Sequence, residues 1–154
     1  MAIDAKPTAQ VFDLRTAYLD QGRNTDMKAR TDRMTLAMKV YAEGGENNMH
    51  HHPDEDHSFV VLEGQATFHL ETDDNVVVLG PNQGIMLPRG ANYWFQSTAD
   101  QNLVMIRVGA TTGDGARTSP VGLGGRLTPD GNVGDAAYYR RGEKVERPGK
   151  RFGE

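Results

Sequence analysis

The sequence contains no cysteine. This absence excludes disulfide bonds, thiolate nucleophiles and cysteine-bound zinc, so a metal ion would have to be held by nitrogen and oxygen ligands. Histidine is therefore the residue type that decides whether a metal site exists. The chain has five histidines, and four of them lie within the eight residues from His50 to His57.

Long apolar runs are also missing. No run approaches the roughly 18–20 apolar residues that a membrane-spanning helix needs, and the first ten residues lack the apolar stretch of a signal peptide. We therefore expect a cytoplasmic protein without a membrane partner.

Lys and Arg number 17 against 21 Asp and Glu, and this net charge of −4 disfavours a nucleic-acid partner. A chain of 154 residues has room for one compact domain rather than two.

The middle of the chain lacks a helical period. Short runs of β-branched and aromatic residues alternate there with Gly, Pro, Asn and Asp. Strict alternation over residues 33–41 predicts a half-buried strand. Further strands are predicted at residues 58–62, 65–70, 75–79, 84–87, 93–96 and 103–108. Many short strands with tight turns and no intervening helices favour an all-β sandwich or barrel.

The two ends of the chain differ from this middle. Residues 1–32 are mostly polar, and we assign them to an N-terminal arm whose apolar cluster at 11–14 adds an outer strand or a short helix to the barrel. Residues 33–110 form the predicted barrel. Residues 111–154 are rich in Gly and Pro and carry a basic cluster. They predict an extended C-terminal arm, either with solvated charges or wrapped over a partner subunit.

The histidine-rich segment is the part of the chain that carries chemistry. Side chains alternate in an extended segment, so His50 and His52 project to one face and His51 to the other. The turn at residues 53–56 returns the chain, so that His57 can face the same interior. Neutral imidazole suits transition metals, and three clustered imidazoles would be costly to protonate without one. The pattern predicts a metal site at His50, His52 and His57.

The stretch from Gly44 to Gly64 resembles the first motif of the cupin superfamily. That motif reads Gly, five residues, His-x-His, three or four residues, Glu, six residues, Gly. His50 and His52 hold their places in the four-residue variant, and His57 occupies the Glu position. The resemblance implies a jelly-roll barrel of the double-stranded β-helix type and a bound divalent transition metal such as Fe, Mn, Ni or Zn.

The second cupin motif is matched less completely. It reads Gly, five residues, Pro-x-Gly, two residues, His, three residues, Asn. Pro88 and Gly90 fit it, whereas Asn82, Tyr93 and Ser97 replace the leading Gly, the His and the Asn. The resemblance therefore implies three histidines and Tyr93 around the metal, with no carboxylate. Such a metal keeps its full positive charge and would suit an anionic, chelating substrate. Tyr93 is either a metal-bound phenolate, an unbound acid/base or hydrogen-bond donor, or an aromatic lining the barrel.

Several residues near these motifs have competing interpretations. Asp56 would take the Glu position in the three-residue variant, but Gly64 would then be one residue out. We expect His51 to lie outside the site and His69, on an alternating strand, to face outward. Arg107 lies between apolar neighbours and either binds a carboxylate or occupies a solvated edge. The whole cluster could also be a surface turn, or belong to a cupin that has lost its metal.

Two functions from different classes fit these observations. The first is a metal-dependent enzyme, of the dioxygenase, isomerase or lyase type, that acts on a small oxygenated metabolite while Tyr93 manages a proton. The second is a non-catalytic small-molecule-binding or sensory cupin, because one fold hosts many functions. The resemblance also predicts a homodimer that forms through sheet faces and exchanged terminal strands.

Overall fold

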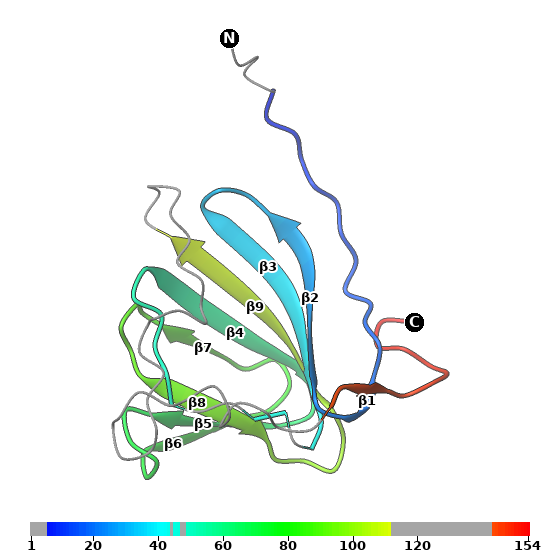
Figure 1. The fold of residues 1–154 in the computed structure, drawn as a ribbon, viewed down its shortest axis with the longest axis vertical. Coiled ribbons are helices and arrows are strands. Elements are labelled where there is room, and N and C mark those ends of the chain that lie inside the picture. The colour runs from blue at the N-terminus through cyan, green and yellow to red at the C-terminus, as the bar shows by residue number, and fades with distance from the viewer. Residues whose placement is uncertain (1–5, 44, 47–48, 112–142) are drawn as a thin grey trace.

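A computed structural model describes residues 6–43, 45–46, 49–111 and 143–154. Within these residues the chain forms β-strands and no helix, so none of them lies in a helix that could cross a membrane (Figure 1). The strands are β1 (Leu19–Gln21), β2 (Arg23–Arg30), β3 (Met34–Tyr41), β4 (Glu55–Glu63), β5 (Ala66–Leu70), β6 (Val76–Leu79), β7 (Gly84–Leu87), β8 (Tyr93–Ser97), β9 (Leu103–Thr111) and β10 (Val145–Glu146). The predicted all-β fold is confirmed.

Two antiparallel sheets face each other and enclose the main core. One has the strand order β2-β3-β9-β4-β7 and the other the order β6-β5-β8; the first lies above the second in Figure 1. Phe59 on β4 meets Phe68 and Phe95 on the opposite sheet, with ring centroids 5.5 and 5.4 Å apart. Burial of such aromatic rings is the main favourable contribution to the stability of this core.

Strand β3 is covered on both faces, which corrects the half-buried strand predicted for residues 33–41. Tyr41 faces the core between the two sheets. Met38 and Val40 face the opposite way and pack against Leu19 and Val104 in a second apolar cluster. Leu19 belongs to the N-terminal part of the chain, so the cover comes from a segment that the local sequence pattern of β3 cannot reveal.

Two segments near the opposite ends of the chain pair on the outer side of the larger sheet. β1 pairs with β10, and the backbones of Thr16 and Phe152 exchange hydrogen bonds of 3.2 and 2.9 Å. Asn102 ties β1 to the barrel, because its buried amide accepts the Leu19 N–H at 2.7 Å and donates to the Leu19 carbonyl at 2.9 Å. Figure 1 shows the pairing of β1 with β10 at the side of the barrel.

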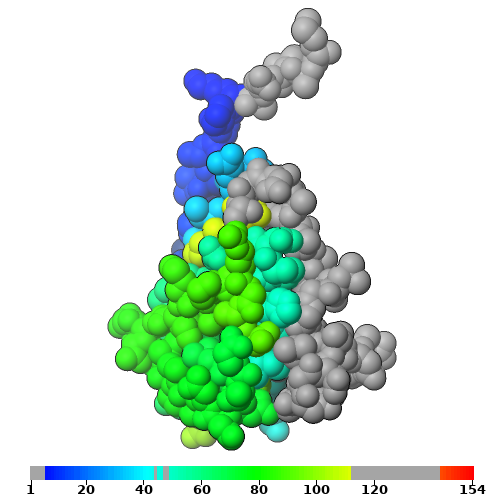
Figure 2. Space-filling model, turned by 90° about the vertical axis from the view of Figure 1, so that its left-hand side faces the viewer, coloured from blue at the N-terminus to red at the C-terminus, as the bar shows by residue number. Residues whose placement is uncertain are grey.

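The N-terminal segment differs from its prediction in detail. Residues 11–14 form neither the outer strand nor the short helix, and Val11 is fully exposed. The segment runs along the molecule and projects beyond the barrel (Figures 1 and 2). Residues 23–30, counted above with the arm, form β2 and pair with β3 as an edge strand. Gly44 and most of the predicted C-terminal arm, residues 112–142, lie outside the described residues.

Candidate metal centre

The two motif regions are joined by backbone hydrogen bonds. His50 and Tyr93 form a β-bridge in which each N–H donates to the other's carbonyl, at 3.0 and 2.9 Å. The Gly90 N–H donates to the His52 carbonyl at 3.0 Å, and Gly90 has a positive φ of 83°, which glycine adopts without strain. These contacts fix the histidine segment beside the start of β8.

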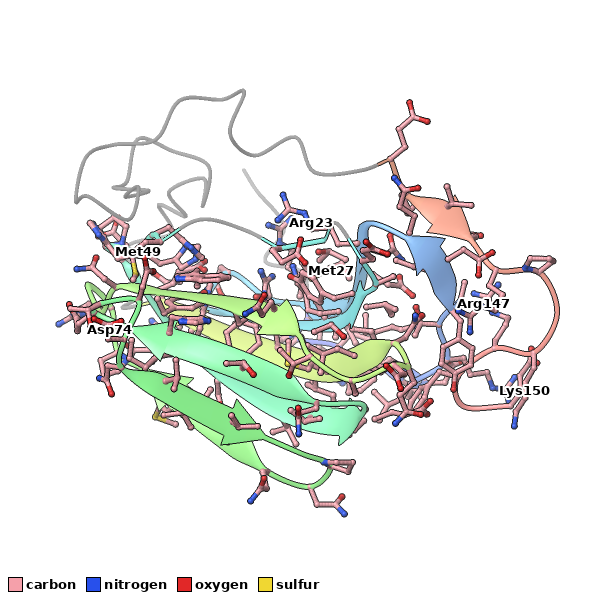
Figure 3. The ribbon with its side chains drawn as sticks, turned by 90° about the horizontal axis from the view of Figure 1, so that it is seen from below. Arg23, Met27, Met49, Asp74, Arg147 and Lys150 are labelled. Atoms are coloured by element: carbon pink, nitrogen blue, oxygen red, sulfur yellow. The ribbon has the colours of Figure 1, made fainter. Side chains whose placement is uncertain are left out.

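The side chains of this segment alternate. His50 and His52 point inward and are buried, and their ring centroids are 5.0 Å apart. His51 points away, and its Nδ1 hydrogen-bonds the Asn92 side-chain oxygen at 3.0 Å. The structure therefore separates His51 from the other histidines. Met49, at the start of this segment, lies at the opposite end of the molecule from Arg147 and Lys150 (Figure 3).

Aromatic contacts bring the four predicted site residues together in the interior. The His52 ring lies 4.1 Å from the His57 ring, and the His50 ring lies 4.4 Å from that of Tyr93, centroid to centroid. The Tyr93 hydroxyl lies 3.3 Å from His57 Nδ1. All four side chains are buried. The structure places their rings as neighbours, but among the described residues the group with ligand atoms within 4.8 Å of one another includes His52 and His57 and leaves out His50. Their role as metal ligands stays a prediction.

A carboxylate also belongs to this cluster, which corrects the interpretation of a site without one. β4 begins at Glu55, so Glu55 and His57 face the same side of the strand, with 2.8 Å between Glu55 Oε2 and His57 Nε2. Ligand atoms of His52, Glu55 and His57 all lie within 4.8 Å of one another. The alternative Asp56 lies on the other face, where its side chain accepts the Arg89 N–H.

Glu55 was missed because residues 53–56 were interpreted as a turn. Pro53 followed by three acidic residues is typical of turns, and the expected strand therefore began at Ser58. In the structure β4 starts earlier because Glu55 pairs with Thr111 at the far end of β9. An extended strand that included Glu55 would have revealed the carboxylate, since residues two apart share a face.

The environment of His57 keeps its imidazole neutral. Burial lowers the pKa of His57 below its ordinary value of 6.5; the hydrogen bond to Glu55 opposes this shift and the positive charge of Arg107 adds to it. His57 Nδ1 faces the Tyr93 hydroxyl and Nε2 faces Glu55, and a proton on Nε2 would have to leave before His57 could bind a metal through that nitrogen together with Glu55. A neutral imidazole is the form that binds metals.

The donor set fits a divalent transition metal. Two imidazoles and one carboxylate form a combination that such ions bind in proteins. Metal–ligand bonds of about 2.0–2.2 Å keep donors at most roughly 4.4 Å apart, so the donors, which lie within 4.8 Å of one another, would move closer together on binding. Gly109 on β9 pairs with His57 on β4. Because it has no side chain, it leaves room for the side chains of Glu55 and His57: a Cβ there would lie 3.4 Å from both Glu55 Oε2 and His57 Cδ2.

A cavity of about 300 Å³ opens beside the cluster. His50, His52 and Tyr93 line one part of it, and the remainder includes aromatic side chains and three cations from the larger sheet, Arg23, Lys39 and Arg107. Arg107 lies on β9 in the middle of this sheet, so its assignment to a solvated edge is wrong.

Residues 37–109 match the family of the cupin domain. This barrel is a cupin domain. Over 46 residues, or 30% of this chain, it is 41% identical to the uncharacterized protein YdbB of Bacillus subtilis (strain 168), and the match spans only 40% of that relative. The predicted membership of the cupin superfamily is confirmed.

Solved structures share the fold. A Klebsiella pneumoniae protein with a double-stranded β-helix domain has a TM-score of 0.60 and 15% identity, covering 73% of this chain and 93% of that one. The protein TT1209 of Thermus thermophilus has a TM-score of 0.56 and 18% identity, covering 62% and 90%. At these identities the likeness concerns the fold, and it confirms the predicted double-stranded β-helix.

This cupin departs from the family motif in a way that the geometry explains. His57 occupies the motif's Glu position, and the carboxylate of the cluster belongs to Glu55, two residues earlier on the same face of β4.

His69 plays no part in the cluster. It faces away from the core, as predicted, but it is buried there because Trp94 stacks on it at 3.8 Å.

Proposed function

We propose that this cupin is a metal-dependent enzyme that acts on a small oxygenated metabolite. In this proposal His52, Glu55 and His57 hold Fe, Mn, Ni or Zn, and His50 is a further ligand. The observation that carries the proposal is the group formed by the buried His52 and His57 and the partly buried Glu55, beside a cavity of about 300 Å³. That volume is at the lower end of the range for small-molecule sites.

The bound ion would supply Lewis-acid chemistry toward a substrate oxygen. The chain's own residues would orient the substrate and manage protons. Tyr93 is placed for this role, since its hydroxyl lies 3.3 Å from His57 Nδ1 and its ring lines the cavity. The aromatic wall formed by Phe59 and Phe95 would exclude water from the apolar part of the substrate.

Metal analysis of the untagged protein tests the first half of the proposal. We expect about one equivalent of transition metal, either as purified or after incubation with Fe, Mn, Ni or Zn. Less than about a tenth of an equivalent that none of these ions restores would contradict the proposal. His52→Ala should abolish binding, whereas His51→Ala, a histidine removed outside the cluster, should leave it unchanged.

Turnover tests the second half. The metal-loaded protein is incubated with a panel of small hydroxy and oxo acids, and conversion is followed by proton NMR and oxygen consumption. Tyr93→Phe should keep the metal and lose most of the conversion if the phenol handles a proton. Metal loss in this variant would instead identify Tyr93 as a ligand. Stoichiometric ligand binding without any conversion would favour a binding or sensory cupin.

A further inference from the structure

Three cationic side chains face the cavity from neighbouring strands of the larger sheet. Arg23 lies on β2, Lys39 on β3 and Arg107 on β9, and all three line the cavity. No carboxylate from the described residues lines it. The cavity therefore has a positive wall that the proposed metal does not require, because a cation repels further cations.

The register places the Arg107 side of this wall next to the histidine cluster. Arg107 pairs with Phe59 on β4, and Gly109, two residues further along β9, pairs with His57. Successive inward-facing positions are about 7 Å apart along a strand. A molecule of a few carbon atoms can therefore contact Arg107 at one end and the cluster at the other.

The hydrogen bonding of these cations leaves capacity for a ligand. Within the described residues Arg107 Nε is buried and has no hydrogen-bond partner, and neither Arg23 nor Arg107 forms an ion pair there. A buried donor without an acceptor is unfavourable, and a guanidinium binds the two oxygens of a carboxylate with parallel hydrogen bonds. The Lys39 Nζ donates to Thr25 Oγ1 at 2.6 Å, which holds its charge at the cavity wall.

We propose that the cavity binds a small organic acid, with a carboxylate held by Arg107 and attracted by Lys39 and Arg23, and with another oxygen directed to the histidine cluster. This inference names the substrate class and so rests on the proposed function. Aromatic side chains beside the cations, such as Tyr41 and Phe95, would contact the carbon skeleton. A wholly polar anion such as phosphate would leave these contacts unused, which is why a carboxylic acid fits better.

Calorimetric titration with malonate tests the inference, using the full-length protein as purified and again after chelation of metal. We expect malonate to bind in both states and malonamide, its neutral counterpart, to bind in neither. Arg107→Gln should weaken malonate binding by about 10- to 100-fold in both states. Arg33→Gln removes the same charge from an exposed position outside the cavity and should change the affinity less than twofold.

The titration of the chelated, metal-free protein separates this inference from the proposed function. If the protein holds no metal but still binds malonate through Arg107, the carboxylate site stands and the metal enzyme fails. If metal binds normally but Arg107→Gln binds malonate like the unmodified protein, the carboxylate site is overturned. It is also overturned if malonate fails to bind at about 10 mM, or if inorganic phosphate binds more tightly than malonate. Circular dichroism and thermal unfolding establish that Arg107→Gln is folded, and Arg107→Met provides a second uncharged variant.

Discussion

Glu55 and His57 lie two residues apart on β4, and their side chains meet with 2.8 Å between Oε2 and Nε2. The contact orients the His57 imidazole and places a carboxylate beside the buried histidines. As a proposed ligand, Glu55 would give the bound ion an anionic donor that the histidines do not supply. The character of the proposed centre therefore depends on this pair.

Removing the charge of Glu55 should weaken metal binding. Glu55→Gln keeps the size of the side chain but replaces a carboxylate by a weaker amide ligand, so we expect the affinity to fall by about 10- to 100-fold. Competition with a chromophoric chelator measures this change. Asp56→Asn is the matched control, because Asp56 is the next residue, lies on the opposite face and is exposed. An equal loss of affinity in both variants would show that general electrostatics, not the Glu55 position, is responsible.

The metal-free protein should lose stability in mild acid because of His57. Burial lowers the pKa of His57 below 6.5, so the unfolded state takes up this proton at a higher pH than the folded state. The contribution of His57 to the free energy of unfolding is then complete above pH 6.5 and decreases as the pH falls toward the folded-state pKa.

Denaturant unfolding of the chelated protein between about pH 8 and pH 5 measures this dependence. His57→Gln should flatten the profile in the window just below pH 6.5, the ordinary pKa of the group. His51→Gln, which removes a histidine outside the cluster, should leave the profile unchanged. A profile that stays the same in His57→Gln would disprove the assignment of the acid sensitivity to this side chain.

Local patterns predicted β3 to β9 because alternation and turn residues are properties of short segments, but they predicted neither β2 nor the pair β1 and β10. The strand at residues 84–87 was predicted with its observed bounds, and the shared face of His50 and His52, opposite to His51, followed from alternation alone. What local patterns could not provide was the pairing between distant strands. Glu55 joined β4 only through its pairing with Thr111.

The same limit explains two errors of burial. Strand β3 was expected to have one solvated face, but Leu19 covers that face from a distant part of the sequence. His69 was assigned an outward direction, which is right, but its cover by Trp94 depends on the cross-strand register of β5 and β8. Arg107 likewise could be placed in the cavity only once β9 was known to be central.

Asn102 should be important for holding the terminal segment on the barrel. Its side chain makes two buried hydrogen bonds to the backbone of Leu19. Asn102→Ala removes both bonds and leaves the buried Leu19 N–H without its side-chain acceptor, while the Leu19 carbonyl keeps the Arg147 Nη2 donor at 3.3 Å, so we expect a loss of about 1–3 kcal/mol in the free energy of unfolding. Denaturant titration measures it. Gln101→Ala alters the exposed neighbouring residue and should change stability by less than about 0.5 kcal/mol; a similar loss in both would contradict this role.

Gly109 should be required for the packing of the cluster. A Cβ at this position would lie 2.8 Å from Thr35 Oγ1 and 3.4 Å from atoms of Glu55 and His57. Gly109→Ala should therefore cost about 1–3 kcal/mol of stability and also weaken metal binding, because the donors can no longer keep their places.

A second substitution tests whether the crowding is the cause. Thr35→Ala removes the atom in closest contact, so the double variant with Gly109→Ala should be more stable than the sum of the two single changes predicts, by at least about 0.5 kcal/mol. Gly80→Ala is the matched control, since a Cβ there would meet only the Gln83 side chain at 3.8 Å. Strict additivity of the Thr35 and Gly109 effects would mean that Gly109 is not needed for the space around the histidine cluster.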